Sequence, residues 1–297
     1  MGSTPQRTRG TRKASETPMS STRPMFPDGH YYSPVIDVDE AIKDQERIWR
    51  EKPEVLGVDF NPRSQKQILK SFPRYLRDYR YPDDPPANAT GAEYYHNNPQ
   101  FGWLDSRALF VMLRRLHPKT MIEVGSGFSS LLTADVNRRF QKGKMHFTCI
   151  EPYPAPFLSQ GVSGISEVVP QRVQDVPLSL FERLHSGDVL FIDSSHVAKT
   201  GSDVNHLLFE VLPRLPKGVI VHFHDIFLPG DYLKEWVLDE GRSWNEEYLV
   251  RALLMDNATF TVLFGSMYAY MCLPELLTRA LGGQYFVGGS LWLRKAK

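Results

Sequence analysis

The chain has 297 residues, with 35 lysine and arginine residues against 34 aspartate and glutamate residues and a net charge of +1. This length allows one α/β domain with additional elements, and the balanced charge argues against a general nucleic-acid-binding protein. No apolar run approaches the roughly 20 residues that a membrane-spanning helix needs. We therefore expect a cytoplasmic protein with neither a membrane nor a nucleic-acid partner.

The N-terminus differs in composition from the rest of the chain. Residues 1–25 are rich in Ser, Thr, Pro, Arg and Lys and contain a single acid, Glu16. Such a segment cannot bury a core, so we expect a disordered tail there. It lacks the apolar stretch of a secretory signal, whereas a transit peptide, which is also arginine-rich and acid-poor, stays open.

A helical extension is predicted over residues 26–118. The stretch 37–81 is typical of helices, with breaks at Pro53 and Pro62, and residues 101–116 have the pattern of an amphipathic helix. Two roles are open for this extension. It covers a ligand crevice, or it is a packing collar that does not contact the site.

A strand-to-helix turn lies in the middle of the chain. Residues 121–130 read MIEVGSGFSS, an apolar run with an acid, then two glycines one residue apart, then a helix-forming segment. Glycines let the backbone turn sharply and let a ligand approach closely, and the following helix directs its N-terminus at that ligand. The pattern predicts a nucleotide-binding turn, with a tight turn that binds nothing as the alternative.

Glu123 decides which nucleotide suits this turn. A dinucleotide-binding turn, G-x-G-x-x-G/A, seats a pyrophosphate, and Ser130 would stand at its third small position. A carboxylate at the strand end repels a pyrophosphate but suits a positively charged ligand. Glu151 ends the next apolar run, 21 residues after Ser130, where an acid reaches ribose hydroxyls in either case. Its alternative is a solvated strand end.

Strand and helix patterns alternate to the C-terminus. Further strands are predicted at 146–151, 165–173, 188–193, 219–223, 259–264 and 285–293, and helices at 178–184, 200–215, 232–238, 245–255 and 268–281. Short apolar strands between helices indicate an α/β fold with a mostly parallel sheet covered on both faces. Ligands of such sheets bind outside the carboxyl ends of the strands. We therefore expect Glu123, Glu151, Asp193 and Asp225 to converge on one crevice.

The glycine turn resembles motif I of the class I S-adenosylmethionine (SAM) methyltransferases, which has an acid two residues before G-x-G. Glu123, Gly125 and Gly127 match that motif, and Ser129 replaces its frequent third glycine. The resemblance implies a Rossmann-like domain over residues 119–297, with a mostly parallel seven-stranded sheet and helices on both faces. It also implies SAM as the cofactor, which carries an ammonium and a sulfonium and has no phosphate.

The resemblance also assigns contacts to the cofactor. The glycine turn would line the methionine end, Glu151 would accept hydrogen bonds from the ribose, and the loop after the third strand would contact the adenine amino group. The expected cofactor-binding residues are Glu123, Gly125, Gly127, Ser129, Glu151, Gln174, Asp175 and Asp193.

Two polar loops follow neighbouring buried strands. Residues 192–196 read I-D-S-S-H, and residues 221–226 read V-H-F-H-D-I. This arrangement resembles a subset of class I methyltransferases with I-D-x-x-H after the fourth strand and H-D after the fifth. Small-molecule and sugar-hydroxyl O-methyltransferases of the antibiotic-tailoring kind show it, and they often hold a divalent metal at the strand ends.

His196, His224 and Asp193 are the expected catalytic residues. Methyl transfer requires removal of the acceptor's proton, and a histidine is a suitable base near pH 7. Alternatively, Asp193, His224 and Asp225 bind a divalent cation that lowers the pKa of a bound hydroxyl. Oxygen ligands suit magnesium, whereas a histidine ligand favours zinc, manganese or iron. Two adjacent aspartates would repel each other without such a cation.

Other residues nearby have plainer interpretations. His222 lies deeper in the strand, on the same face as His224, and is typical of a core histidine. Asp203 favours a helix start. Cys149 and Cys272 lie in apolar segments and are expected to be small buried side chains without a disulfide.

The sequence therefore predicts a SAM-dependent methyltransferase that acts on a small molecule, with oxygen favoured over nitrogen or carbon as the acceptor atom. A nicotinamide-dependent oxidoreductase is the first rival, which the acid before Gly125 disfavours. A SAM-binding module without catalysis is the second. The substrate, metal dependence and homo-oligomerisation stay open.

Overall fold

The computed structural model describes residues 24–87 and 91–297. They form two compact units, one ending at Asp37 and one running from Val38 to Lys297, and each is described by itself. In the first unit the Phe26 ring stacks on His30 with centroids 4.6 Å apart. The tail predicted over residues 1–25 lies almost entirely outside the described residues. The domain boundary predicted at 118/119 stays a prediction.

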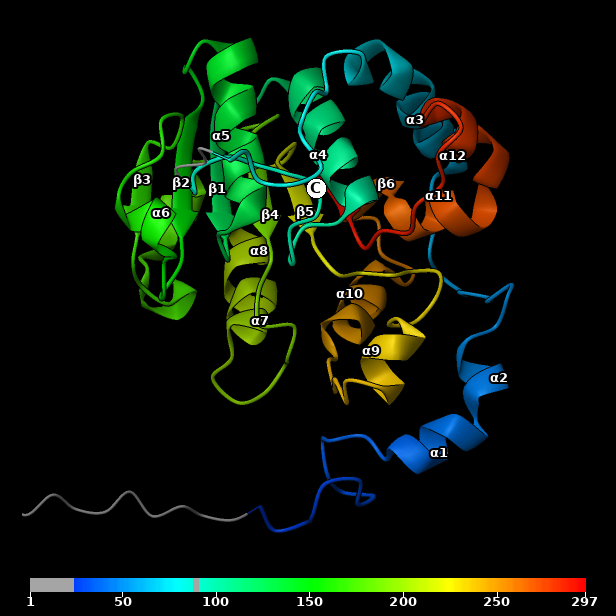
Figure 1. Cartoon of the computed structure of the whole chain (residues 1–297). Helices are drawn as coiled ribbons and strands as arrows, with labels where there is room; N and C mark the ends of the chain where they lie inside the picture. The colour runs from blue at the N-terminus through cyan, green and yellow to red at the C-terminus, as the bar shows by residue number, and fades with distance from the viewer. Residues whose placement is uncertain (1–23, 88–90) are drawn as a thin grey trace, which may run out of the picture. The chain divides into compact units, whose positions relative to one another are not determined.

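Seven strands form one sheet in the second unit (Figure 1). Their order is β3-β2-β1-β4-β5-β7-β6, and every neighbouring pair is parallel except those of β7, which runs antiparallel to β5 and β6. The strands are β1 (Thr120–Val124), β2 (His146–Ile150), β3 (Glu167–Val169), β4 (Val189–Ile192), β5 (Ile220–Phe223), β6 (Phe260–Gly265) and β7 (Leu291–Lys295). The predicted mostly parallel seven-stranded sheet is confirmed.

The helices of the second unit are α1 (Val38–Lys43), α2 (Gln45–Ile48), α3 (Pro62–Leu76), α4 (Trp103–Leu116), α5 (Phe128–Gln141), α6 (Pro156–Ser159), α7 (Asp203–His206), α8 (Leu212–Arg214), α9 (Lys234–Leu238), α10 (Glu246–Leu254), α11 (Ser266–Cys272) and α12 (Pro274–Ala280). Several of them cover the two faces of the sheet. Two short 3₁₀ helices (Val173–Asp175 and Leu178–Arg183) precede β4, and a π-helical turn (Leu207–Val211) joins α7 to α8. The helix predicted at 200–215 is thus present as one run with a π-turn at its centre.

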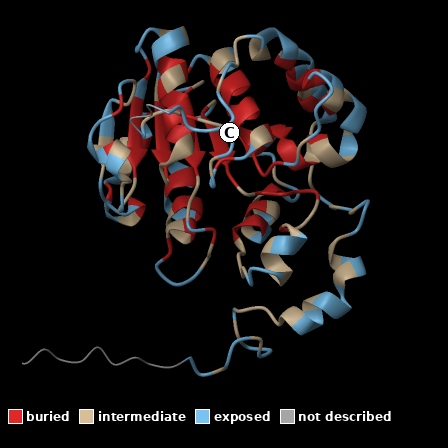
Figure 2. Ribbon diagram, viewed as in Figure 1, coloured by how far each residue is buried: buried red, intermediate tan, exposed pale blue. Residues whose placement is uncertain are grey.

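Apolar side chains alternate between two cores, one on each face of the sheet. In β4, Val189 and Phe191 belong to the core shared with α3, α4, α5 and α12, whereas Leu190 and Ile192 belong to the core shared with α7, α8 and α10. Apart from β3, whose residues are exposed or half-buried, the strands are buried along almost their whole length (Figure 2). Burying one such side chain contributes roughly 1.5–3 kcal/mol. The cores hold the strands in register, and the polar residues are left at the strand ends.

Several predicted elements have different bounds in the structure. The last strand begins at Leu291, not at residue 285, because the backbone of Gly289 and Ser290 donates hydrogen bonds to the Asp105 side chain. Strand β3 stops at Val169, since Pro170 has no N–H to donate. The helical pattern over 37–81 is interrupted between α2 and α3, as the predicted breaks at Pro53 and Pro62 imply, and Pro62 begins α3 with Asn61 as its cap.

The two cysteines differ in exposure. Cys149 is buried, but Cys272 is exposed, so the prediction that both are buried is wrong for Cys272. Cys272 is the last residue of α11, where the helix end leaves its side chain uncovered. No helix among residues 24–87 and 91–297 combines the length and apolar character needed to cross a bilayer.

Candidate active site

A crevice of about 670 Å³ lies at the carboxyl ends of the central strands. This volume falls in the range of about 300–1,000 Å³ that is usual for ligand pockets. It is lined by the glycine turn (125–129), Glu151, the loops after β4 and β5, the segment 98–102 before α4, and side chains of the α9–α10 region. Of the four acids predicted to converge on one crevice, Glu151, Asp193 and Asp225 line it, whereas Glu123 does not.

The glycine turn is fitted against the loop after β4. Gly125 has φ +79°, and a Cβ placed on it would lie 1.7 Å from the Asp193 carbonyl oxygen. The Asp193 N–H donates to the Val124 carbonyl at 2.8 Å. Only glycine satisfies both the left-handed backbone and this close approach. The turn thus places Asp193 beside the N-terminus of α5.

Glu123 lies beneath the turn and is fully buried. Its carboxylate accepts hydrogen bonds from the Ser129 hydroxyl at 2.6 Å and from the Ser130 hydroxyl. Burial raises the pKa of Glu123 to about 7, against the lowering effect of these two hydrogen bonds. Glu123 therefore ties the strand to the start of α5. Its predicted contact with the methionine end of SAM stays a prediction.

We expect Glu123→Gln to remove a pH dependence of folding stability. Because the pKa of Glu123 is about 7 in the folded protein against an ordinary 4.5, the wild-type protein loses stability as pH rises through this window. The shift corresponds to roughly 3 kcal/mol. Urea unfolding of both proteins at about pH 4 and pH 8 should show the variant gaining that much relative to wild type. An equal difference at the two pH values would refute the assignment.

Glu151 follows β2 and borders the crevice. Its carboxylate accepts hydrogen bonds from the Ser126 N–H at 3.2 Å and the Tyr153 N–H at 2.9 Å. These contacts hold the carboxylate beside the glycine turn, where a ligand's hydroxyl groups can reach it.

Gln174 and Asp175 do not line the crevice. The Gln174 amide donates to the Gly201 carbonyl at 3.1 Å, and Asp175 forms an exposed ion pair with Arg172 at 2.8 Å. Their contact with adenine stays a prediction.

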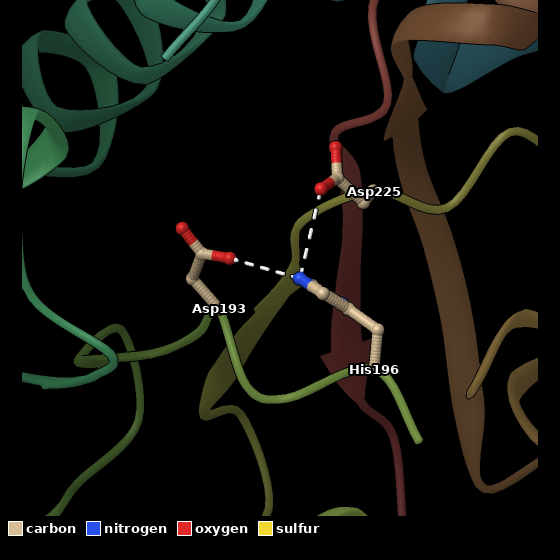
Figure 3. A group of neighbouring side chains, drawn as sticks. All are labelled: Asp193, His196 and Asp225. Carbon is tan, nitrogen blue, oxygen red and sulfur yellow. Dashed lines mark ion pairs between the residues drawn. The ribbon is translucent and has the colours of Figure 1, made fainter. Parts of the chain in front are cut away.

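Three polar side chains meet at the ends of β4 and β5. The Nε2 atom of His196 lies 3.3 Å from Asp193 Oδ1 and 3.6 Å from Asp225 Oδ2, and one donor atom from each residue lies within 4.8 Å of the others. Figure 3 shows the two carboxylates directed at the histidine nitrogen. His196 and Asp225 have φ +60° and +55°, a strained conformation that is concentrated at functional sites.

His224 lies next to this trio and is buried. Its Nδ1 atom is 3.3 Å from Asp225 Oδ1 and 3.6 Å from Asp193 Oδ1, and its Nε2 atom is 3.7 Å from Asp105 Oδ2. Neither ring nitrogen makes a hydrogen bond with a residue in the described part of the chain. The compact group of potential metal ligands is therefore Asp193, His196 and Asp225, with His196 in place of the predicted ligand His224. The loop after β4 folds His196 back between the two aspartates.

In this cluster, the carboxylates and the imidazoles stabilise each other's charged forms. Burial lowers the pKa of His196, but hydrogen bonds to Asp193 and Glu246 outweigh it and raise that pKa to about 10. Burial also opposes ionisation of Asp193, yet His224 and His196 hold the pKa of this carboxyl well below its usual range. The pKa of His224 is raised well above 6.5 by Asp225 and Asp193, against the effect of burial. The crevice therefore holds ionised carboxylates beside basic imidazoles.

Two buried acids of the site escaped the sequence analysis. Asp105 in α4 accepts hydrogen bonds from the Ser266 hydroxyl and from the backbone of Gly289 and Ser290, and Glu246 in α10 contacts His196 at 2.9 Å. In sequence each is an acid in the first turn of a helix, which is common without function. No local signal separates them from such acids.

The plainer interpretations hold for His222 and Asp203. His222 is fully buried, stacks on Phe191 at 3.9 Å, and pairs with the Ser290 hydroxyl at 3.0 Å. Asp203 starts α7 and accepts hydrogen bonds from the Ser195 N–H and hydroxyl at 2.8 Å and 2.6 Å.

Comparison with known proteins agrees with this geometry. A family model described as a methyltransferase domain matches residues 122–226, which include the glycine turn and both polar loops. An uncharacterized protein of Archaeoglobus fulgidus is 40% identical over 164 residues, which are 54% of this chain and 74% of the relative. Residues 122–226 therefore form a methyltransferase domain, and the predicted resemblance to the class I SAM-dependent methyltransferases is confirmed.

A solved structure is also similar to this methyltransferase. A crystal structure from Klebsiella pneumoniae, provisionally assigned as an O-methyltransferase, has 13% sequence identity and a TM-score of 0.36, over 77% of this chain and 90% of that chain.

Proposed function

We propose that this methyltransferase transfers the methyl group of SAM to a hydroxyl oxygen of a small molecule, and that Asp193, His196 and Asp225 hold a divalent metal that assists the reaction. The observation that carries the proposal is the group of one imidazole and two carboxylate donors that converge within 4.8 Å beside the glycine turn. Such a mixed set of oxygen and nitrogen donors suits Mn²⁺, Fe²⁺ or Zn²⁺ better than an all-oxygen site would.

The glycine turn fits the cofactor. A Cβ at Gly125 would fill the narrow space between the turn and Asp193, and the turn opens onto the crevice beside Glu151. SAM carries positive charges that the acidic crevice favours, and when bound it supplies an electrophilic methyl group. Gly125 and Gly127 let the backbone approach the methionine end, and Glu151 accepts hydrogen bonds from ribose hydroxyls.

The opposite wall of the crevice suits the acceptor. Leu233, Trp236 and Trp244 line it with half-buried apolar surface, and the Trp244 ring lies 4.4 Å from the His196 ring, centroid to centroid. An acceptor packed against this wall brings a hydroxyl to Asp193, Asp225 and His196. A divalent cation held by the two aspartates would lower the pKa of that hydroxyl. The same cation would offset the effect of these aspartates on His224, so that a neutral His224 could accept the hydroxyl's proton.

Glu151→Ala should weaken SAM binding by about 10- to 100-fold. The variant leaves two ribose hydroxyls without a charged acceptor, and a hydrogen bond to a charged group contributes roughly 1.5–3 kcal/mol. Calorimetric titration with SAM measures the effect, and Asp256→Asn, which changes an exposed acid outside the crevice, is the control that should bind SAM normally. Unchanged SAM affinity in Glu151→Ala would remove Glu151 from the cofactor site.

The metal-assisted reaction is tested with a screen of hydroxyl-bearing small molecules and radiolabelled SAM. For each acceptor that is methylated, we expect EDTA to abolish turnover and Mn²⁺ to restore it. A different outcome is turnover that is unaffected by EDTA and falls about 10²–10⁴-fold in His196→Ala or His224→Ala. That result would indicate that a histidine base, and not a metal, activates the acceptor. Methylation of amines or carbon acids alone would contradict the oxygen acceptor. SAM binding without transfer to any acceptor would favour a binding module.

A further inference from the structure

Glu246, the first residue of α10, is buried beneath the candidate metal site. Its carboxylate contacts His196 Nδ1 at 2.9 Å and accepts a hydrogen bond from the Ser194 hydroxyl at 3.1 Å. The Asn245 and Glu246 N–H groups both donate to the His196 carbonyl at 3.1 Å. The start of α10 thus holds both the backbone and the ring of His196.

These contacts fix which nitrogen of His196 faces the aspartates. Glu246 occupies Nδ1, so Nε2 is the atom directed at Asp193 and Asp225. The two ring nitrogens are chemically distinct. When one nitrogen carries a proton and donates it to a carboxylate, the other is left to bind a metal or a further partner. A ring rotation would exchange the nitrogens and leave the buried Glu246 carboxylate with only the Ser194 hydroxyl as a partner, and the loss of its ion-pair partner is costly for a buried acid.

We propose that Glu246 is a positioning residue that holds His196 through Nδ1 and thereby aims Nε2 at the space between Asp193 and Asp225. This inference rests on the proposed function only in its consequence for metal binding. Partners of this kind orient a metal-ligating histidine and make its other nitrogen a better ligand, and their loss lowers metal affinity by about 10- to 100-fold. The orientation of the ring itself does not depend on a metal.

Glu247 provides a matched control. It is the next residue of α10, is equally buried, and accepts a hydrogen bond from the Phe227 N–H. Its own N–H is bonded to the Tyr232 hydroxyl at 3.0 Å, and no described contact joins its side chain to His196. Glu247→Gln therefore replaces a buried carboxyl group in the same helix turn and leaves the His196 ring in place. Any general effect of replacing a buried carboxyl group in α10 should appear in this variant too.

The test compares Glu246→Gln, Glu246→Ala and Glu247→Gln with wild type. The first readout is the ring-nitrogen NMR spectrum of histidine-labelled protein, in which His196 is assigned by its absence from His196→Gln. We expect wild type and Glu247→Gln to share a His196 signal with a strongly hydrogen-bonded Nδ1 proton. Glu246→Gln should show a weaker bond to its neutral amide oxygen, and Glu246→Ala should lose it.

The second readout is the affinity for Mn²⁺ by calorimetry, with S-adenosylhomocysteine affinity as a control for folding of the crevice. We expect Mn²⁺ affinity to fall by about 10- to 100-fold in Glu246→Ala and less in Glu246→Gln, and to be unchanged in Glu247→Gln. S-adenosylhomocysteine should bind all variants alike.

Each result decides the matter. Wild-type ring signals in both Glu246 variants, or equal losses of Mn²⁺ affinity in Glu246→Gln and Glu247→Gln, would overturn the positioning role. If Glu246→Ala does not fold, Glu246→Gln still provides both readouts. If wild type binds no Mn²⁺, the proposed metal site fails, and the NMR comparison alone decides whether Glu246 orients His196.

Discussion

Asp225→Asn should lower kcat for a hydroxyl acceptor by about 10²–10⁴-fold, the range expected when a group that stabilises charge or moves a proton is lost. Asn has the shape of Asp and tolerates the left-handed backbone that Asp225 adopts at φ +55°. The substitution therefore removes one negative charge from the space facing His196 Nε2 with little change in the fold. Mn²⁺ affinity should fall by at least about 100-fold, because a direct ligand counts for more than the outer partners of such a site.

Asp256→Asn is the matched control for this variant. Asp256 has φ +49°, is exposed, and lies outside the crevice. It should keep wild-type kcat, and both variants should bind SAM within a few-fold of wild type. If Asp225→Asn methylates its acceptor at the wild-type rate, Asp225 takes no part in the chemistry.

Gly125→Ala should destabilise the folded protein by about 2–6 kcal/mol. The estimate adds roughly 1–3 kcal/mol for a side chain at a strained φ to roughly 1–3 kcal/mol for overpacking. The overpacking is severe because the added Cβ would lie 1.7 Å from the Asp193 carbonyl oxygen, which belongs to the backbone and must shift. This loss is a large part of a typical stability of about 5–15 kcal/mol. SAM binding should be lost with it.

Gly143→Ala separates the two contributions. Gly143 has φ +69°, and a Cβ there meets nothing within 4 Å, so this variant carries the backbone strain alone. Denaturant unfolding should place Gly125→Ala well below Gly143→Ala in stability. Equal stabilities would show that the close approach between the glycine turn and Asp193 is absent in solution.

The sheet was predictable because its strands are short, apolar and separated by helices. Val189 and Leu190 lie on opposite faces of β4, and a strand buried on both faces has no polar face to obscure the pattern. The bounds near residue 290 were not predictable. Gly289 and Ser290 bond to Asp105, which lies 184 and 185 residues away in the sequence, and local patterns carry no information about such partners.

The candidate site was predictable to the level of its strand ends. Glu151, Asp193 and Asp225 line the crevice as expected, because parallel strands bring their carboxyl ends to one edge. The direction of each side chain was not. Glu123 lies beneath the turn with its oxygens bonded to Ser129 and Ser130, since its place in the strand points it into the core shared with α5.

The partners of the histidines were also beyond prediction. His196 turns back on a left-handed backbone and is held by Glu246, 50 residues later in the chain. Residues 98–102, before α4, and Asp105, in α4, border the crevice, so this part of the predicted N-terminal extension reaches the candidate site. The sequence of this segment contains no motif that indicates a position at the crevice.

The most direct test of the account is a crystal structure with S-adenosylhomocysteine and Mn²⁺. We expect the ribose hydroxyls to contact Glu151 and the homocysteine part to lie over Gly125–Gly127. We also expect an anomalous-difference peak for a manganese ion coordinated by Asp193, His196 and Asp225. S-adenosylhomocysteine bound away from the glycine turn would contradict the cofactor site. The cofactor in place with no manganese peak between the three side chains would contradict the metal site.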